Sequence, residues 1–214
     1  MHIPNGFLDP VTATTTAAAT GGMLVYGWNK VRQEMRQQSP ITLGLVAAFI
    51  FAAQMINFAI GHHTSGHLIG AMVAVAVCGP WTAGILMSAV LGVQSLFFHD
   101  GGTIALGANI FNMAIVATAV SYMVYTAVMN KTGSRSIAMA TGAWLSVLAA
   151  SVAVAVELAA SGTASLASVV PAMLGWHSLI GIGEAGITIL SVSFIVKYAK
   201  EAELKGQVKE YAQN

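Results

Sequence analysis

The sequence predicts an all-α integral membrane protein with seven transmembrane helices, and three observations support this fold class. First, 56% of the 214 residues are hydrophobic and only 8% are charged, whereas about 25% of the residues in a soluble domain are charged. Second, the mean hydropathy is +0.73, and apolar residues fall in stretches near the roughly 20 residues that a helix needs to cross a bilayer. Third, the basic residues are confined to three short segments. Because basic loops lie on the cytoplasmic side, their positions indicate how many times the chain crosses the membrane.

The first ten residues, MHIPNGFLDP, form a polar leader ahead of the first apolar stretch. A secretory signal begins with basic residues followed by an apolar core, but here Pro, Gly and Asp come first and no basic residue precedes Lys30. We therefore expect the leader to stay on the mature protein. Met1 is expected to stay as well, because the enzyme that removes initiator Met requires a small second residue and His2 is bulky.

Six apolar stretches follow the leader, and the third is too long for a single crossing. It runs from about 67 to 98 and contains Gly79-Pro80, a natural break because Pro lacks an N–H and clashes with the preceding turn. If this stretch crosses twice, all nine basic residues lie on the cytoplasmic side and the N-terminus lies outside. If it crosses once, the two basic loops fall on opposite faces. We therefore predict seven helices.

The chain is expected to form a single transmembrane domain of residues 1–214. Its parts are a leader at 1–10, helices within about 11–198 and a cytoplasmic tail at 199–214. The predicted helices are 11–29, 41–60, 66–79, 81–98, 103–129, 137–160 and 171–196. This topology places five of the six histidines on the outer side, namely His2, His62, His63, His67 and His99.

Composition also excludes several classes of function. A formal net charge of +1 offers neither a basic field for nucleic acid nor an acidic tail. The single cysteine, Cys78, lies in an apolar run, so we expect a small buried side chain and neither a disulfide framework nor a Cys-rich metal motif. No P-loop, HExxH or GxSxG motif occurs in its required setting. ATP hydrolysis is therefore expected only on partner chains.

The leader itself can chelate a metal ion. The amine of residue 1, the backbone nitrogen of His2 and a ring nitrogen of His2 close fused five- and six-membered rings around one ion. The amide must lose its proton to bind, and Cu(II) and Ni(II), which favour tetragonal nitrogen fields, are best able to drive that loss. Pro4 removes a competing N–H and stiffens the chain. A fourth ligand in the plane is still missing.

The loop GHHTSGHLIG at 61–70 is the expected source of that fourth nitrogen. We predict His67, because it follows Gly66 and begins the next apolar helix, whereas His62 and His63 end the previous helix or lie in the loop. The alternative is that these histidines lie at the headgroup interface, which suits polar-tipped rings. Their appearance together with the His2 chelate favours the metal site.

Further polar residues within the apolar stretches have two interpretations each. Gln54 and Asn57 near the outer end of the second helix, and Asn109 and Asn112 in the fifth, either orient the ligands or hydrogen-bond between helices, and taken singly the latter is favoured. Glu157 ends the sixth helix as an exposed carboxylate without a required function.

Two further features concern the second and last helices. His177 and Glu184 share one face of the last helix, where they serve either a proton path or packing with other helices. Gly44, Ala48 and Ala52 repeat every four residues on the second helix, which indicates either a docking face for a partner or close packing within the bundle.

The leader MHIPNGFLDP together with TSGHLIG at 64–70 resembles the nickel and cobalt substrate-binding membrane subunits of energy-coupling factor transporters, the NikM/CbiM group. The resemblance covers nearly the whole chain. It implies that the leader folds back into the outer end of the bundle, where the Met1 amine, the backbone and ring nitrogens of His2 and the ring of His67 form a square-planar site. Candidates to orient these ligands are Gln54, Asn57, His63 and Ser65.

The resemblance also implies partners. These are a transmembrane coupling subunit docking through Gly44, Ala48 and Ala52, two cytoplasmic ATPase subunits, and often a small accessory membrane subunit. It implies a bacterial or archaeal cell membrane, with the N-terminus outside and the C-terminus cytoplasmic. The family often has an acidic residue where this chain has Asn5, which weakens a role for a carboxylate there and leaves the chelating nitrogens unaffected.

The leading hypothesis is therefore uptake of Ni(II). Co(II) comes second because it favours a square-planar coordination geometry less strongly. A membrane enzyme with a catalytic metal is a different class, and it requires an open coordination position and a nearby general base. Asp100 and Glu157 are the obvious outer carboxylates for that role. A stand-alone channel or carrier is a third class, in which His177 and Glu184 would matter most.

Overall fold

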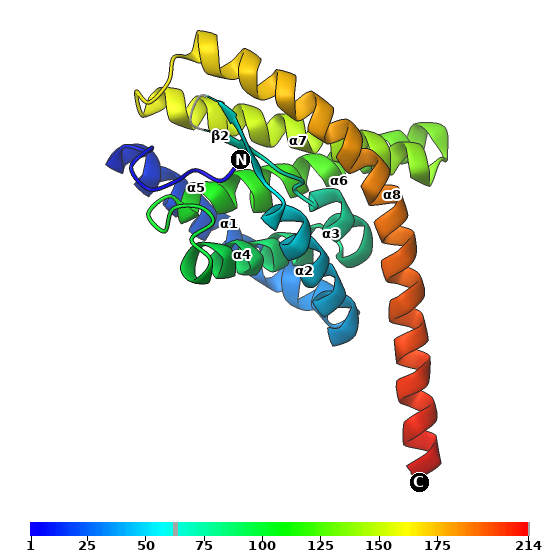
Figure 1. Cartoon of the computed structure of the whole chain (residues 1–214). Coiled ribbons are helices and arrows are strands. Elements are labelled where there is room, and N and C mark those ends of the chain that lie inside the picture. The colour runs from blue at the N-terminus through cyan, green and yellow to red at the C-terminus, as the bar shows by residue number, and fades with distance from the viewer. Residues whose placement is uncertain (62–63, 214) are drawn as a thin grey trace.

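The computed structural model describes residues 1–61 and 64–213, which form helices and one small hairpin (Figure 1). The elements are α1 (Pro10–Met35), α2 (Pro40–Met55), β1 (Phe58–Gly61), β2 (Thr64–Gly66), α3 (Ala71–Cys78), α4 (Pro80–Phe97), α5 (Leu106–Ile110), the π-helical η1 (Phe111–Val116), α6 (Ala117–Thr132), α7 (Arg135–Ala160) and α8 (Leu166–Gln213).

Seven helical segments are present in the described part of the chain when α5, η1 and α6, which follow one another without a break, are counted as one. Four described helices are long and apolar enough to cross a membrane, namely Pro80–Phe97, Leu106–Thr132, Arg135–Ala160 and Leu166–Tyr198. The apolar helix α2 is shorter, with 16 residues. The chain is thus a multi-pass membrane protein, and the predicted number of helices fits the structure.

The segment between α2 and α3 differs from the prediction. A helix was expected to 60 and again from 66, but α2 ends at Met55 and the chain forms an antiparallel hairpin in which Phe58 pairs with Gly66 and Ala59 with Ser65. Glycines are poor helix formers, and Gly61, Gly66 and Gly70 interrupt this region. His67 therefore follows a strand and does not begin a helix.

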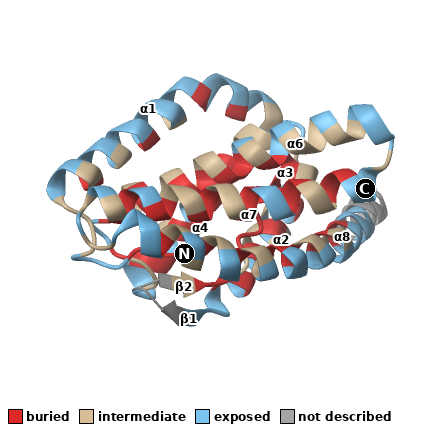
Figure 2. Cartoon of the chain, turned by 90° about the horizontal axis from the view of Figure 1, so that it is seen from above, coloured by how far each residue is buried: buried red, intermediate tan, exposed pale blue. Residues whose placement is uncertain are grey.

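Helix α3 is short and buried. It has eight residues, or about 12 Å of helix, and it is enclosed by its neighbours with Ala71, Met72 and Ala74 each 0% exposed. Figure 2 shows buried residues concentrated on α3, α4 and α7, while α1 lies at the periphery with much of its surface exposed. The segment 67–70 that leads into α3 is thereby brought to the interior of the bundle.

Helix α8 extends well beyond the bundle towards the C-terminus (Figure 1). The expected tail at 199–214 is part of this helix to Gln213. Its sequence, KEAELKGQVKEYAQ, is rich in Ala, Glu, Lys and Gln, which favour helix even without packing. The tail is therefore a polar, helical continuation of α8.

Candidate metal centre

The leader crosses between the hairpin and the loop after α4, and Asn109 of α5 fixes its backbone. Asn109 Oδ1 accepts the Ile3 N–H at 2.8 Å, and Asn109 Nδ2 donates to the Ile3 carbonyl at 3.1 Å. The Gly102 N–H donates to the same carbonyl at 2.8 Å. Buried backbone groups require such partners. The Asn109 side chain supplies both an acceptor and a donor to Ile3, as a neighbouring β-strand would do.

Two consecutive glycines allow the leader to approach this closely. A Cβ on Gly102 would overlap the Asn5 nitrogen and Pro4, and Gly101 has φ +90°, with space for a Cβ limited by Asn109 Nδ2 at 2.9 Å. Asn5 secures the same loop, because its Oδ1 accepts the Ile104 N–H at 2.9 Å. The amide at position 5 therefore has a loop-binding role that a carboxylate could fill only in part, since Asn5 Nδ2 also donates to Thr103 Oγ1 at 3.4 Å.

The Met1 amine is buried beside strand β2. Met1 is 1% exposed, and its amine donates to the Ser65 carbonyl and to Ser65 Oγ, the latter at 2.9 Å. Burial lowers the pKa of the amine to about 4, with the negative charge of Asp100 acting in the opposite direction. A neutral amine that donates two hydrogens keeps one lone pair, which is the form that binds a metal ion.

The rings of His2 and His67 lie against one another. Their centroids are 4.5 Å apart with 21° between the ring planes, and the two residues are 6% and 1% exposed. His67 Nδ1 contacts the Leu68 carbonyl at 2.8 Å. A carbonyl only accepts, so Nδ1 carries the hydrogen and Nε2 has the free lone pair. His67 Nε2 and both ring nitrogens of His2 are buried without a hydrogen-bond partner.

Both rings are held in the neutral state. Burial lowers the pKa of His2 to about 3, and the nearby amine acts in the same direction. Burial likewise lowers the pKa of His67, and the amine, His2 and His177 add to that effect. His2 Nδ1 lies 3.3 Å from Asp100 Oδ1, but with a neutral ring at pH 7 this contact is not an ion pair.

The segment that carries His67 is fixed from two helices. Glu184 of α8 accepts the Ile69 N–H at 2.6 Å and the Gly70 N–H at 2.8 Å, one on each carboxylate oxygen. Gln54 of α2 donates to the Ile69 carbonyl at 2.8 Å. Glu184 and Gln54 are 2% and 0% exposed. Since a buried carboxylate with two backbone donors is a rigid anchor, α8 and α2 determine where His67 sits.

The structure brings some of the predicted site residues together. Met1, His2, Ser65 and His67 meet, while Gln54 lies one step away on the Ile69 carbonyl. Asn57 contacts Asp100 Oδ2 at 3.4 Å and none of the proposed ligands by a described hydrogen bond. His63, like His62, lies outside the described residues. Gly44, Ala48 and Ala52 are all exposed along one face of α2.

The expectation for one carboxylate is wrong, and the structure gives hydrogen-bond partners to the other. Glu157 was expected to be exposed, but it is 7% exposed and accepts Asn112 Nδ2 at 2.6 Å, because helix α5–η1 packs against the end of α7. Glu184 packs with another segment through Ile69 and Gly70, and His177 Nδ1 donates to the Met173 carbonyl of its own helix at 2.8 Å. No described hydrogen bond joins Glu184 to His177.

Sequence reasoning missed two residues at this site. Gln94 of α4 is 0% exposed, lies beside His2, and has neither amide atom in an aligned hydrogen bond. Gly102 is required by the close approach of the leader. A polar residue inside the apolar stretch 81–98 was the available signal for Gln94, and no local pattern marks Gly102.

Within residues 1–61 and 64–213, no three His, Cys, Asp or Glu side chains come together as a metal site. The donors that the leader and the segment of His67 offer are two main-chain nitrogens, the Met1 amine and the His2 amide, together with three buried ring nitrogens that have no hydrogen-bond partner. The donors present are nitrogens, which suit Ni(II), Cu(II) and Co(II) better than Mg(II) or Ca(II).

Comparisons with known proteins agree with this architecture. Residues 2–202 match the family described as "Cobalt uptake substrate-specific transmembrane region". The chain is 38% identical over 197 residues to the putative fused nickel transport protein NikMN of Archaeoglobus fulgidus, covering 91% of this chain and 65% of that protein. It is 28% identical to the cobalt transport protein CbiM of Acetoanaerobium sticklandii, covering 94% of this chain and 86% of that one.

A solved structure also matches. The chain superimposes on the crystal structure of a truncated transition metal transporter with a TM-score of 0.86 and 33% identity, covering 92% of this chain and 99% of that chain. Because the family match extends over nearly all of the sequence, this chain belongs to the CbiM family of cobalt-uptake substrate-specific transmembrane proteins.

Proposed function

We propose that this protein binds Ni(II), and Co(II) as a second cargo, as the substrate-binding subunit of an ATP-driven transporter of the energy-coupling factor class. One observation carries the proposal: a buried neutral amine, the adjoining His2 and the ring of His67 converge, and both ring nitrogens of His2 and Nε2 of His67 lack hydrogen-bond partners. Relatives named for nickel and cobalt transport support the choice of metals.

The four proposed ligands are the Met1 amine, the His2 amide nitrogen, His2 Nδ1 and His67 Nε2. His2 Nδ1 is the ring nitrogen that closes a six-membered ring with the amide of its own residue. Binding replaces the water ligands of the cation by nitrogens, and the amide proton leaves to solvent. A planar field of four nitrogens suits the electron count of Ni(II) better than that of Co(II), so we propose nickel as the preferred cargo.

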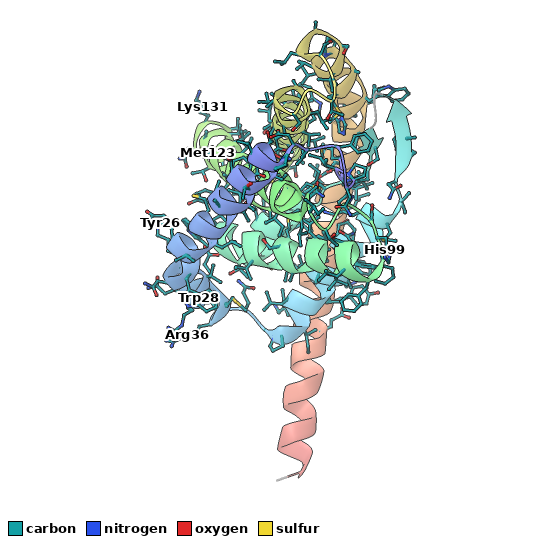
Figure 3. All side chains as sticks on the ribbon, turned by 90° about the vertical axis from the view of Figure 1, so that its left-hand side faces the viewer. Tyr26, Trp28, Arg36, His99, Met123 and Lys131 are labelled. Atoms are coloured by element: carbon teal, nitrogen blue, oxygen red, sulfur yellow. The ribbon has the colours of Figure 1, made fainter. Side chains whose placement is uncertain are left out.

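The proposed orientation in the membrane follows from the positions of the basic residues, and the proposed docking face follows from the exposed small residues of α2. Figure 3 shows His99 on the opposite side of that view from Arg36 and Lys131. By the positive-inside rule, the metal centre faces outside and the long end of α8 faces the cytoplasm. The exposed small residues Gly44, Ala48 and Ala52 offer a face for a transmembrane coupling subunit, which would connect the protein to two ATPases and to a small accessory membrane subunit.

The sharpest test of the site blocks the amine of Met1. Intact mass first establishes that Met1 is the N-terminal residue of the purified protein. An acetyl group on the Met1 nitrogen converts the amine into an amide without a basic lone pair and alters no side chain. We expect it to abolish tight nickel binding as completely as His2→Ala, while Lys131→Ala, at an exposed position, retains it. Tight binding by the acetylated protein would refute the amine as a ligand.

The cargo is tested separately in cells. Deletion of the gene is expected to lower uptake of ⁶³Ni at limiting nickel more than uptake of ⁵⁷Co, and protein purified from such cells is expected to contain nickel. Unchanged uptake of both metals would contradict the transport function. Uptake that persists without any partner ATPase would favour a stand-alone carrier instead.

A further inference from the structure

A cleft of about 670 Å³ opens beside the metal centre. Its walls come from the leader, the β1–β2 hairpin and the loop after α4, and they include His2 and Ser65, which contact or form the proposed ligand set. A solvent-side cation therefore reaches the chelate through this space.

Charge in the cleft has one sign. Among the described residues that line it, Asp100 is the single carboxylate, and there is no Lys or Arg. The nine Lys and Arg residues of the chain lie at 30–36, 131–135 and 197–209, outside every segment that lines the cleft. A cleft lined by one sign of charge concentrates ions of the opposite sign.

The end of α4 holds Asp100 at the wall. His99 has φ +56°, the left-handed conformation that ends many helices, and the Asp100 N–H donates to the Gln94 carbonyl at 3.1 Å. Asn57 then donates to Asp100 Oδ2 at 3.4 Å. The other oxygen, Oδ1, faces His2 Nδ1 at 3.3 Å.

The nitrogen set alone gives a hydrated cation little attraction. An amine and imidazole rings carry no negative charge in any protonation state that they adopt in water, and the His2 amide becomes anionic only as the metal binds. A divalent ion with one deprotonated amide retains a charge of about +1, which is costly in a largely buried site. An adjacent carboxylate offsets this charge, and its oxygen is a ligand that a hydrated cation readily accepts.

From this geometry we propose that Asp100, oriented by Asn57, is the capture site at which a hydrated divalent cation first binds before it passes to the four nitrogens. Oδ1 replaces one water of the cation, and the chelating ring nitrogen of His2 is the neighbouring donor. The carboxylate then remains beside the loaded site as its counter-charge. This inference rests on the proposed nickel-binding function.

The test measures association of Ni(II), added as the chloride, with the purified full chain at pH 8 by stopped-flow absorbance. Asp100→Asn is expected to lower the association rate constant by about tenfold at low ionic strength, within the range of electrostatic steering. Salt is expected to slow the unmodified protein and to have little effect on the variant. Asp100→Glu restores the charge and is expected to recover most of the rate. Glu201→Gln, which removes one exposed carboxylate of α8, is the matched control and should not change it.

The outcomes separate the two levels of inference. Equal association rates and equal salt dependence for Asp100→Asn and the unmodified protein would overturn the capture site and leave the nickel centre intact. If Asp100→Asn slows binding and Asp100→Glu does so equally, charge is not the cause and the capture site is also refuted. Failure of the unmodified protein to bind nickel would instead refute the proposed function, and the capture site with it.

Discussion

Replacing Glu184 by Gln tests how the bundle positions His67. In the native protein both Glu184 oxygens accept backbone N–H groups, from Ile69 at 2.6 Å and from Gly70 at 2.8 Å. Gln has one acceptor oxygen, so its NH₂ group must face the other N–H. One buried donor is then unpaired, which costs about 1–3 kcal/mol. The segment 67–70 can relieve this cost by moving away from α8, and His67 moves with it.

The expected effect on the site follows from that magnitude. If displacement of His67 reduces the free energy of metal binding by about 1.4 kcal/mol, metal affinity falls about tenfold. The three nitrogens of Met1 and His2 do not depend on Glu184 and should still bind. Loaded with Cu(II) as a spectroscopic probe, the unmodified protein is expected to give an electron paramagnetic resonance spectrum of four nitrogens. The variant is expected to give three nitrogens and one oxygen.

A matched variant separates positioning from general loss of stability. Glu157→Gln makes the same chemical change at another buried carboxylate, one that accepts Asn112 Nδ2 and makes no described hydrogen bond to the segment 67–70. It should keep the four-nitrogen spectrum even if its melting temperature falls. Our reasoning would be refuted if Glu184→Gln retained both the four-nitrogen spectrum and an affinity within twofold of the unmodified protein.

Three further predictions concern the leader. Asn109→Ala removes both side-chain hydrogen bonds to Ile3, so the buried amine should react with an amine-directed reagent about tenfold faster at pH 7 than in the unmodified protein, as measured by mass spectrometry. Equal rates would show that other contacts hold the leader. Gly102→Ala should weaken nickel binding at least tenfold in a titration, because its Cβ would overlap the leader, whereas Gly92→Ala, with open space around it, should not; equal affinities would contradict the close approach. Acidification should release the leader of the metal-free protein. The amine has a pKa of about 4 when the leader is docked and 8.0 when it is free, so between these values the undocked state binds more protons. Docking therefore weakens as pH falls from 8 towards 4. Hydrogen exchange of residues 1–8, corrected for the intrinsic effect of pH, would disprove this if protection were constant over that range.

The part of the site that sequence could predict is its local chemistry. Two adjoining residues hold three of the four proposed nitrogens, so Met1 and His2 could be recognised without knowing the fold. His67 was predicted for a wrong structural reason, since it follows β2 and does not begin a helix. What fixes it is the carboxylate of Glu184, 115 positions from Ile69 along the chain. No periodicity links residues that far apart.

Burial was the other quantity that sequence could not supply. Glu157 looked like a carboxylate at an exposed helix end, and only the packing of α5–η1 against α7 shows that it is enclosed and bound by Asn112. Asn109 and Gln54 were recognised as polar residues in apolar helices, but helix-to-helix bonding was the favoured interpretation for each. Both instead bind backbone groups of non-helical segments, because such segments inside a bundle have no partners of their own.

The two halves of the proposed centre are held by different parts of the protein, and this separation has a mechanistic consequence. Asn109 and Gly102 fix the leader, whereas Glu184 and Gln54 fix the segment of His67. A cation bound to nitrogens of both halves adds a bond between them, and by mass action it stabilises the docked leader in proportion to its affinity. Conversely, apparent affinity falls with the fraction of molecules in which the leader is docked. Substitutions at Asn109 should therefore weaken binding without changing the spectrum of the loaded site, because the site once formed is intact. Substitution of Glu184 changes the spectrum, because the site itself has lost a ligand.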